Sequence, residues 1–232
     1  MKNFNLEANE IIERYKRRAK KDKADFYNIA TPSCMMSSLE KEKHTIRILA
    51  KNFGCDFVNR RFLEVGCGTG TNLCNLISWG VNPENLFGND IFEPSLVTAR
   101  QRLPQTVSLQ QGNFLDCNYD NQSFDVILFS TVLSSILDED FQIEYIKRSY
   151  NLLNPNGIVL LYDFQFDNPW NKDVKGINLK KLKQGVTWTH STFSRITLYP
   201  SLARKLEFSP FLIRVLTACK FLNTHVIGFF RK

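Results

Sequence analysis

Three glycines at alternate positions, Gly66, Gly68 and Gly70, stand between a short apolar run and a stretch that can form a helix. The apolar residues 62–65 have the pattern of a buried strand, and residues 72–79 can continue as the helix. A strand, a glycine turn and a helix in this order bring backbone N–H groups and a helix N-terminus close to a ligand. Glycine suits the turn because it adopts backbone angles that other residues avoid and has no Cβ. The pattern predicts a site for a cofactor that contains a nucleoside.

Two classes of cofactor are bound by turns of this kind. The dinucleotide fingerprint is G-x-G-x-x-G/A, and its third small residue falls here on Thr71, which is neither Gly nor Ala. The glycines instead form G-x-G-x-G, with the acidic residue Glu64 two positions before the first of them. Residues 62–72 therefore resemble motif I of the class I S-adenosylmethionine-dependent methyltransferases. A tight strand-to-helix turn without a ligand is the alternative.

Further chemically useful residues stand where later strands are expected to end. Asp90 ends the second strand, 24 residues after Gly66, and a carboxylate there can accept both hydroxyls of a ribose. Asn113 and Phe114 follow the third strand, and an amide beside a flat ring suits adenine. Ser130 follows the fourth strand. Helix capping by Asp90 and a turn role for Asn113 are the structural alternatives.

The resemblance to the methyltransferases extends over residues 62–163, because the Gly-Asn-Phe of 112–114 and the Leu-Leu-Asn-Pro-Asn-Gly of 152–157 follow in the family's order. It implies S-adenosylmethionine as the cofactor. Glu64 and the three glycines would hold its methionine part, Asp90 its ribose, and Asn113 with Phe114 its adenine, while Ser130 would lie near the methionine end. Tyr15 would close over the cofactor's carboxylate or pack in the core. The predicted cofactor-binding residues are Tyr15, Glu64, Gly66, Cys67, Gly68, Gly70, Asp90, Ile91, Asn113, Phe114 and Ser130.

The elements that would position these residues alternate from residue 61 onward. Continuous apolar strands separated by helices indicate a parallel sheet that is covered on both faces. Strands are expected at about 61–66, 86–91, 107–111, 124–129 and 158–162, with helices at 71–79, 94–102 and 139–153. Later segments predict a helix near 176–184 and strands at 193–198 and 226–230. Before residue 61, helices are expected at 9–23 and 39–53, with a turn at Thr31-Pro32-Ser33.

The family resemblance implies a Rossmann-like, doubly wound α/β fold. Its sheet has seven strands and is mostly parallel, with an antiparallel last strand. Residues 193–198 and 226–230 fit the last two strands, with a helical insertion at about 201–223 between them. We therefore expect an N-terminal helical cap at 1–60 and a methyltransferase domain at 61–232.

Composition narrows the compartment and the partners. The first 25 residues lack the apolar core of a signal peptide, and the apolar stretch 208–230 is broken by Arg214 and Lys220. The six cysteines form no CxxC pair and no metal spacing, so we expect a cytoplasmic chain with free thiols and no metal. Residues 172–232 contain 12 Lys and Arg and two acidic residues, so this part has a net charge of +10, while the whole chain has a net charge of +7. This asymmetry suits a nucleic acid, a phosphorylated sugar or an anionic membrane surface; a solvated surface without a partner is the alternative.

The implied reaction is in-line displacement at the methyl group of a sulfonium. The protein would mainly align the reactants and exclude water, and a hydroxyl acceptor would also need a base. Asp163, at the mouth of the fifth strand, is the first candidate for this base, and His190 is the second. His225 directly precedes the last strand and His44 lies on a helix, so we expect structural or surface roles for both.

The residues after the fourth strand constrain the acceptor. Ser130-Thr131-Val132-Leu133 stands where amino-methylating relatives have Asn-Pro-Pro-Tyr, and no cysteine is placed for cytosine-C5 chemistry. Residues 168–177, 195–200 and 224–228 are similar to small methyltransferases found with bacterial surface-polysaccharide enzymes. This similarity implies a sugar or other small-molecule hydroxyl as acceptor, phosphate-bearing or lipid-linked. An RNA methyltransferase and a non-catalytic cofactor-binding subunit are the alternative functions, and the oligomeric state is left open.

Overall fold

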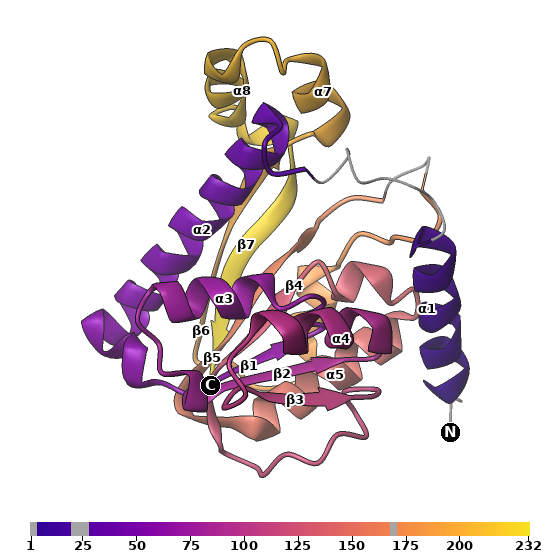
Figure 1. Ribbon diagram of the computed structural model, residues 1–232, viewed down its shortest axis with the longest axis vertical. Helices are drawn as coiled ribbons and strands as arrows, with labels where there is room; N and C mark the ends of the chain where they lie inside the picture. Colours follow the sequence, from indigo (N-terminus) through magenta and orange to yellow (C-terminus); the bar gives the residue numbers. More distant parts are fainter. Residues whose placement is uncertain (1–3, 20–27, 168–170) are drawn as a thin grey trace.

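The computed structural model describes residues 4–19, 28–167 and 171–232, and its central element is a seven-stranded sheet (Figure 1). The strand order is β3-β2-β1-β4-β5-β7-β6. This arrangement confirms the predicted seven-stranded Rossmann-like α/β fold. The strands are β1 (Phe62–Val65), β2 (Leu86–Asp90), β3 (Ser108–Gln111), β4 (Phe124–Ser130), β5 (Leu153–Phe164), β6 (His190–Leu198) and β7 (Asn223–Arg231).

The first five strands run parallel, and β7 is antiparallel to both of its neighbours. From β1 the chain moves to β2 and β3 on one side and then crosses to β4 and β5 on the other. The order therefore reverses between β1 and β4, and ligands of such sheets bind outside the carboxyl ends of the strands at this reversal. The glycine turn after β1 lies at this place.

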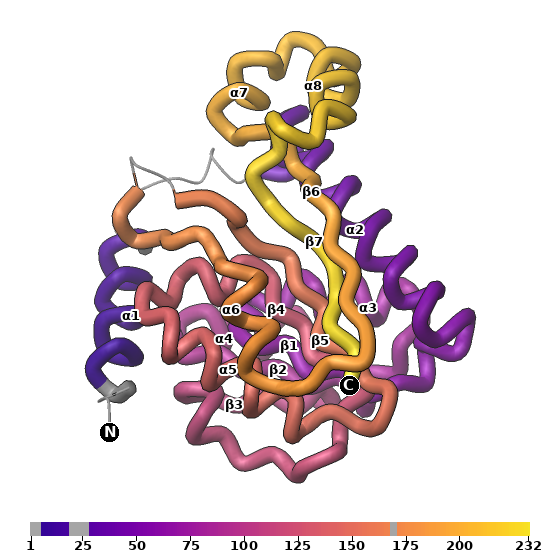
Figure 2. The backbone as a smooth tube through the Cα atoms, turned by 180° about the vertical axis from the view of Figure 1, so that it is seen from behind, coloured from indigo at the N-terminus to yellow at the C-terminus, as the bar shows by residue number. Residues whose placement is uncertain are grey.

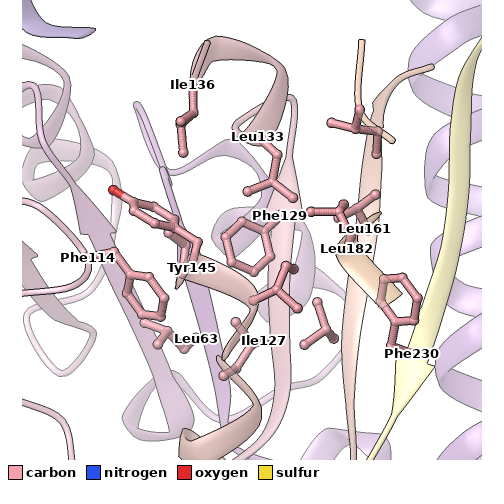
Figure 3. Packing of buried hydrophobic residues seen from close by; sticks show 14 of the residues in the cluster. Leu63, Phe114, Ile127, Phe129, Leu133, Ile136, Tyr145, Leu161, Leu182 and Phe230 are labelled. Atoms are coloured by element: carbon pink, nitrogen blue, oxygen red, sulfur yellow. The ribbon is translucent and has the colours of Figure 1, made fainter. Parts of the chain in front are cut away.

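Helices cover the sheet in two layers because alternate strand residues point to opposite faces. Phe62, Val126 and Leu128 pack on one face with α2 (Pro32–Phe53), α3 (Thr71–Ser78) and α4 (Glu93–Arg102). Leu63, Ile127 and Phe129 pack on the other face with α1 (Phe4–Ala19), α5 (Glu139–Leu152) and α6 (Leu179–Gln184). Figure 3 shows this second cluster, in which Phe129 lies beside Leu133 and Tyr145.

The N-terminal part differs from the sequence-based expectation at one point. Thr31-Pro32-Ser33 is not a free-standing turn, because α2 begins at Pro32 and continues to Phe53. Proline suits the first helical position, where its missing N–H would have no helical partner. The predicted helix 9–23 corresponds to α1, which ends at Ala19, and residues 20–23 lie outside the described part.

The last third of the chain forms longer strands than expected. β6 and β7 each begin three residues earlier than predicted. Residues 190–192 of β6 pair with residues 229–231 of β7, and Asn223 at the start of β7 pairs with Leu198. Between them the predicted helical insertion forms two short helices, α7 (Pro200–Lys205) and α8 (Pro210–Thr217). Both views show these helices projecting from one end of the molecule (Figures 1 and 2). Within the described ranges, no helix is long and apolar enough to cross a bilayer.

Candidate cofactor site

The glycine turn after β1 has the backbone that its sequence predicts. Gly66, Gly68 and Gly70 all have positive φ, at 67°, 53° and 78°. A Cβ on Gly66 would come within 2.5 Å of the Val132 side chain, so this glycine permits close packing. A Cβ on Gly68 would meet nothing within 4 Å. The turn therefore exposes its middle glycine on the side where a ligand can approach.

Asp90 joins the end of β2 to this turn. Its Oδ2 accepts a hydrogen bond from the Gly68 N–H and its Oδ1 accepts one from the Phe92 N–H, both at 2.8 Å. Burial raises the pKa of the Asp90 carboxyl, and these backbone donors oppose the rise. Asp90, Gly66 and Ile91 line one pocket together, as the sequence predicted for the carboxyl edge.

Cys67 occupies the turn as a small packed residue. Its backbone N–H donates to the Asn89 carbonyl at 2.9 Å, and its sulfur lies against Gly88 of β2. Burial raises the pKa of the thiol, so the sulfur stays protonated at neutral pH. A packing role follows for this side chain.

Glu64 is buried and belongs to a polar chain that the sequence did not predict. Asn72 donates through Nδ2 to Glu64 Oε1 and accepts at Oδ1 from Lys41 Nζ at 2.8 Å. Burial raises the pKa of Glu64 and lowers that of Lys41, while the attraction between their charges opposes both shifts. The second carboxyl oxygen of Glu64 is buried without a hydrogen-bond partner. An unsatisfied acceptor of this kind fits an ammonium group such as the one on a bound methionine moiety.

The N-terminal helix α1 lies against the pocket that contains Asp90. Ile11 and Tyr15 line this pocket, and the Tyr15 ring stacks on Phe92 at 5.8 Å between centroids. Arg14 fixes the helix in place, because its buried guanidinium donates to the Ser135 carbonyl at 3.1 Å and to Glu7 at 2.6 Å. Tyr15 thus lies beside the predicted ribose carboxylate, whereas the family resemblance implied the methionine carboxylate.

Asn113 and Phe114, which were expected to bind adenine together, have different surroundings in the structure. Asn113 Oδ1 accepts a hydrogen bond from the Tyr145 hydroxyl at 2.9 Å, and its amide donates to Asp116. Phe114 is fully buried, and its ring packs edge-on against Phe129 and Tyr145 (Figure 3). The expectation that the Phe114 ring packs on adenine is therefore corrected, because this side chain points into the core and not into the pocket.

Tyr145 is a pocket residue that sequence reasoning missed. It comes from α5 and reaches the same pocket as Asp90 and Gly112. Burial raises the pKa of its hydroxyl, which therefore acts as a hydrogen-bond donor. Its apolar helical spacing marks it only as a core residue, so its place in the pocket depends on the packing of α5.

A second, smaller pocket lies on the other side of β1. It is lined by Lys41, Asn72, Ser130 and Tyr162. Ser130 ends β4 as predicted, and the next residue, Thr131, has a φ of 57°. A positive φ is strained for a β-branched residue, and such strain is concentrated at functional sites.

The two predicted bases do not both reach this edge. Asp163 lies at the carboxyl end of β5 but is fully buried, where it accepts backbone hydrogen bonds from Ser134 and Phe164. Burial raises its pKa to about 6. His190 pairs with Arg231, and Arg231 pairs with Ile158, which is level with Phe62 at the amino end of β1. The prediction that His190 is catalytic is therefore wrong, because the antiparallel register takes it to the opposite end of the sheet.

His225 has the structural role expected for it. It is buried between the rings of Tyr162 and Phe164, with centroids at 4.9 and 3.9 Å. Burial, and then the Lys41 charge, lower its pKa to about 3, so the ring is neutral at physiological pH.

The chain is similar in sequence and in fold to known methyltransferases. The family model described as a methyltransferase domain matches residues 62–157. The chain is 30% identical over 145 residues to the tRNA N(3)-cytidine methyltransferase METTL2 of Bos taurus, covering 57% of this chain and 37% of the relative. It is 32% identical over 114 residues to the demethylmenaquinone methyltransferase of Lactobacillus johnsonii, covering 46% of this chain and 45% of the relative. The match thus spans less than half the length of either relative.

Among solved structures, the N-methyltransferase NodS of Bradyrhizobium japonicum, in complex with S-adenosylhomocysteine, has a TM-score of 0.66 at 14% identity. The match covers 96% of this chain and 98% of that one. Likeness at this identity shows the fold. The matched residues 62–157 contain the glycine turn and Asp90, so this part of the chain is similar to a methyltransferase domain, and the fold is one that a solved methyltransferase shares.

Proposed function

We propose that this chain binds S-adenosylmethionine and transfers its methyl group to a hydroxyl of a sugar or another small molecule. The observation that supports this most directly is the convergence of the glycine turn, Glu64 and Asp90 at one edge of the sheet, within the matched residues 62–157. In this proposal residues 1–60 are a helical cap on a methyltransferase domain of residues 61–232.

The proposed roles follow from the contacts of each side chain. Asp90 holds the ribose while it keeps its bond to the Gly68 N–H. Glu64, with its unpaired oxygen, holds the ammonium of the methionine part. Tyr15 covers the ribose side and excludes water. When bound, the cofactor supplies an electrophilic methyl group on a positively charged sulfur, so alignment and water exclusion are the protein's main contributions.

Asp163 is better suited to positioning than to proton transfer in this conformation. The hydrogen bond that it accepts from the Ser134 N–H holds the segment Leu133–Ser135, which lies between β4 and α5. This segment includes Ser135, to which α1 is tied through Arg14. We therefore propose that Asp163 supports the wall of the cofactor pocket through the segment that α1 contacts.

A hydroxyl acceptor is supported by the residues that follow β4. Ser130 and Thr131 stand in place of the Asn-Pro-Pro-Tyr box of amino-methylating relatives. The sugar assignment rests on the similarity of residues 171–177, 195–200 and 224–228 to methyltransferases found with surface-polysaccharide enzymes; residues 168–170 of that similarity lie outside the described residues. The basic C-terminal part suits a phosphate-bearing or lipid-linked acceptor.

The acceptor can be tested by incubating the protein and S-adenosylmethionine with nucleotide sugars, glycolipids and small amines, followed by mass spectrometry. We expect methyl gain on a hydroxyl-bearing sugar and formation of S-adenosylhomocysteine. Methylation of the amines alone would overturn the hydroxyl assignment. Cofactor binding without turnover of any acceptor would instead favour a non-catalytic subunit.

An RNA methyltransferase is the second candidate, favoured by the bovine relative whose name denotes a tRNA methyltransferase and by the +10 balance of residues 172–232. Filter binding with tRNA at increasing salt tests it. Affinity that falls linearly on logarithmic axes as salt increases would support this candidate, because phosphate contacts release counterions. A titration without binding at low salt would remove it.

A further inference from the structure

The helices between β6 and β7 form a separate projection, which we call the α7–α8 lobe (residues 199–222). Figures 1 and 2 show it standing clear of the sheet, in contact with the beginning of α2. Leu198, Ala203 and Ile213 form its small buried core, and Met36 of α2 packs against it. The lobe is thus a packed structure with an inner and an outer side.

The outer side of the lobe exposes large apolar residues. Phe208, Phe211 and Phe221 are exposed to 78%, 72% and 77%. On α8, Ile213 is buried while Phe211 and Val215, one helical turn apart, are both exposed. Single exposed apolar residues are normal on a protein surface, but three exposed phenylalanines within one small lobe indicate a docking surface.

Positive charge accompanies these phenylalanines. Arg204, Lys205, Arg214 and Lys220 are all exposed in the lobe. Its acidic residue, Glu207, faces inward and accepts a hydrogen bond from Ser33 of α2 at 2.6 Å. The outer surface therefore combines apolar and cationic side chains.

The neighbouring helix α2 extends this positive surface. Lys43 and Arg47 are exposed on it. Their charges and that of Lys220 reach His44, where burial first and then these cations lower the imidazole pKa. The cations of α2 and of the lobe therefore lie near one another.

From the exposed phenylalanines and the surrounding cations, we propose that the α7–α8 lobe docks on the surface of an anionic lipid membrane. The phenylalanine rings enter the boundary between headgroups and acyl chains, and the lysines and arginines contact lipid phosphates. Charge complementarity favours this occupant over a second copy of the chain, because two such surfaces would bring like charges together.

The position of the lobe relates docking to the cofactor site. The carboxyl end of β5, Phe164, pairs with His225, two residues after the beginning of β7 at Asn223. The lobe therefore joins the sheet at the same edge where the glycine turn and Asp90 lie. A docked lobe would hold that edge near the membrane surface, where a lipid-linked molecule is available.

Vesicle flotation tests the proposal with the full chain. We expect it to float with vesicles that contain phosphatidylglycerol, to float weakly with phosphatidylcholine alone, and to be released by high salt. Replacing Phe208, Phe211 and Phe221 together by serine should weaken vesicle affinity by about tenfold or more, and so should Lys205→Glu with Lys220→Glu.

Matched variants control for surface changes in general. Val97→Ser removes an exposed apolar residue from α4, and Lys51→Glu with Lys180→Glu reverses two exposed charges outside the lobe. Both should float like the wild type, and circular dichroism should show that every variant is folded. Absence of flotation of the wild type with anionic vesicles, or equal loss in the controls, would overturn the proposal. A dimer in light scattering that the phenylalanine variant abolishes would also overturn the proposal. RNA binding that this variant abolishes, without any vesicle binding, would overturn it too. Isothermal titration with S-adenosylmethionine distinguishes failure of docking from failure of the methyltransferase assignment.

Discussion

The carboxyl of Asp90 accepts a hydrogen bond from the backbone N–H of Gly68, with 2.8 Å between Oδ2 and the nitrogen. This contact ties the last residue of β2 to the middle of the turn that follows β1. Each carboxylate oxygen has two lone pairs. Asp90 can therefore hold the turn and accept ribose hydroxyls at the same time.

Asp90→Ala should weaken the binding of S-adenosylmethionine by at least about tenfold, since hydrogen bonds to a charged group contribute about 1.5–3 kcal/mol each. The variant also loses the bonds to the Gly68 and Phe92 N–H groups, so the turn becomes less well fixed. Isothermal titration measures the change. Asp120→Ala, at an exposed position, is the control and should bind like the wild type. Unchanged affinity in Asp90→Ala would refute the ribose assignment.

Gly68→Ala, compared with a control, separates the effect of a side chain on ligand binding from its effect on backbone strain. Its φ is 53° and a Cβ there meets no neighbour, so the substitution should lower the free energy of unfolding by about 1–2 kcal/mol. We expect the free energy of cofactor binding to weaken by more than this. Gly54→Ala is the matched control, because Gly54 has a φ of 62° and open space but lies at the end of α2. Urea unfolding should show both variants destabilised, while titration shows weaker binding for Gly68→Ala alone. Equal affinity of the two variants would contradict a ligand beside Gly68.

Tyr145→Phe tests the pocket residue that the sequence did not indicate. It removes the hydroxyl that donates to Asn113, which should cost about 1 kcal/mol of stability and weaken cofactor binding by disturbing Asn113. Tyr150→Phe on the same helix, where the ring packs on Trp188, should bind the cofactor normally. If both variants bound the cofactor as the wild type does, Tyr145 would have no part in the site.

The buried carboxyl of Asp163 should make stability depend on pH. Burial raises its pKa from 3.8 to about 6, so the folded protein holds this proton more tightly than the unfolded chain. The free energy of unfolding therefore falls as pH rises between these two values, by about 3 kcal/mol for this group alone. Asp163→Asn cannot ionise, so urea unfolding from about pH 4 to about pH 6 should show a smaller fall. Asp120→Asn should keep the wild-type dependence, and an identical fall in all three proteins would refute the shifted pKa.

Strand positions and the glycine turn could be predicted because they depend on local patterns. A continuous apolar run indicated β4, short apolar stretches indicated β1 and β2, and the three glycines indicated the positive φ angles. Asp90 was found by its distance from the turn, which the βαβ unit keeps nearly constant. Local sequence thus predicted most of the fold and the turn at which the candidate site lies.

Side-chain direction and long-range contacts could not be predicted. Phe114 follows a strand like the site residues, yet its ring turns into the core beside Phe129. His190 was misplaced because the antiparallel register of β6 and β7 decides which end of the sheet it occupies. Lys41 reaches Asn72 only because α2 packs beside α3, and no local pattern indicates that contact.

We propose that the turn from Gly66 to Gly70 and Asp90 together form a binding site for S-adenosylmethionine. Isothermal titration of the wild-type protein with this cofactor, and separately with S-adenosylhomocysteine, tests it most directly. We predict that both bind, with dissociation constants in the micromolar range. If neither compound binds while circular dichroism shows a folded protein, the turn is not a cofactor site and its glycines have a purely structural role.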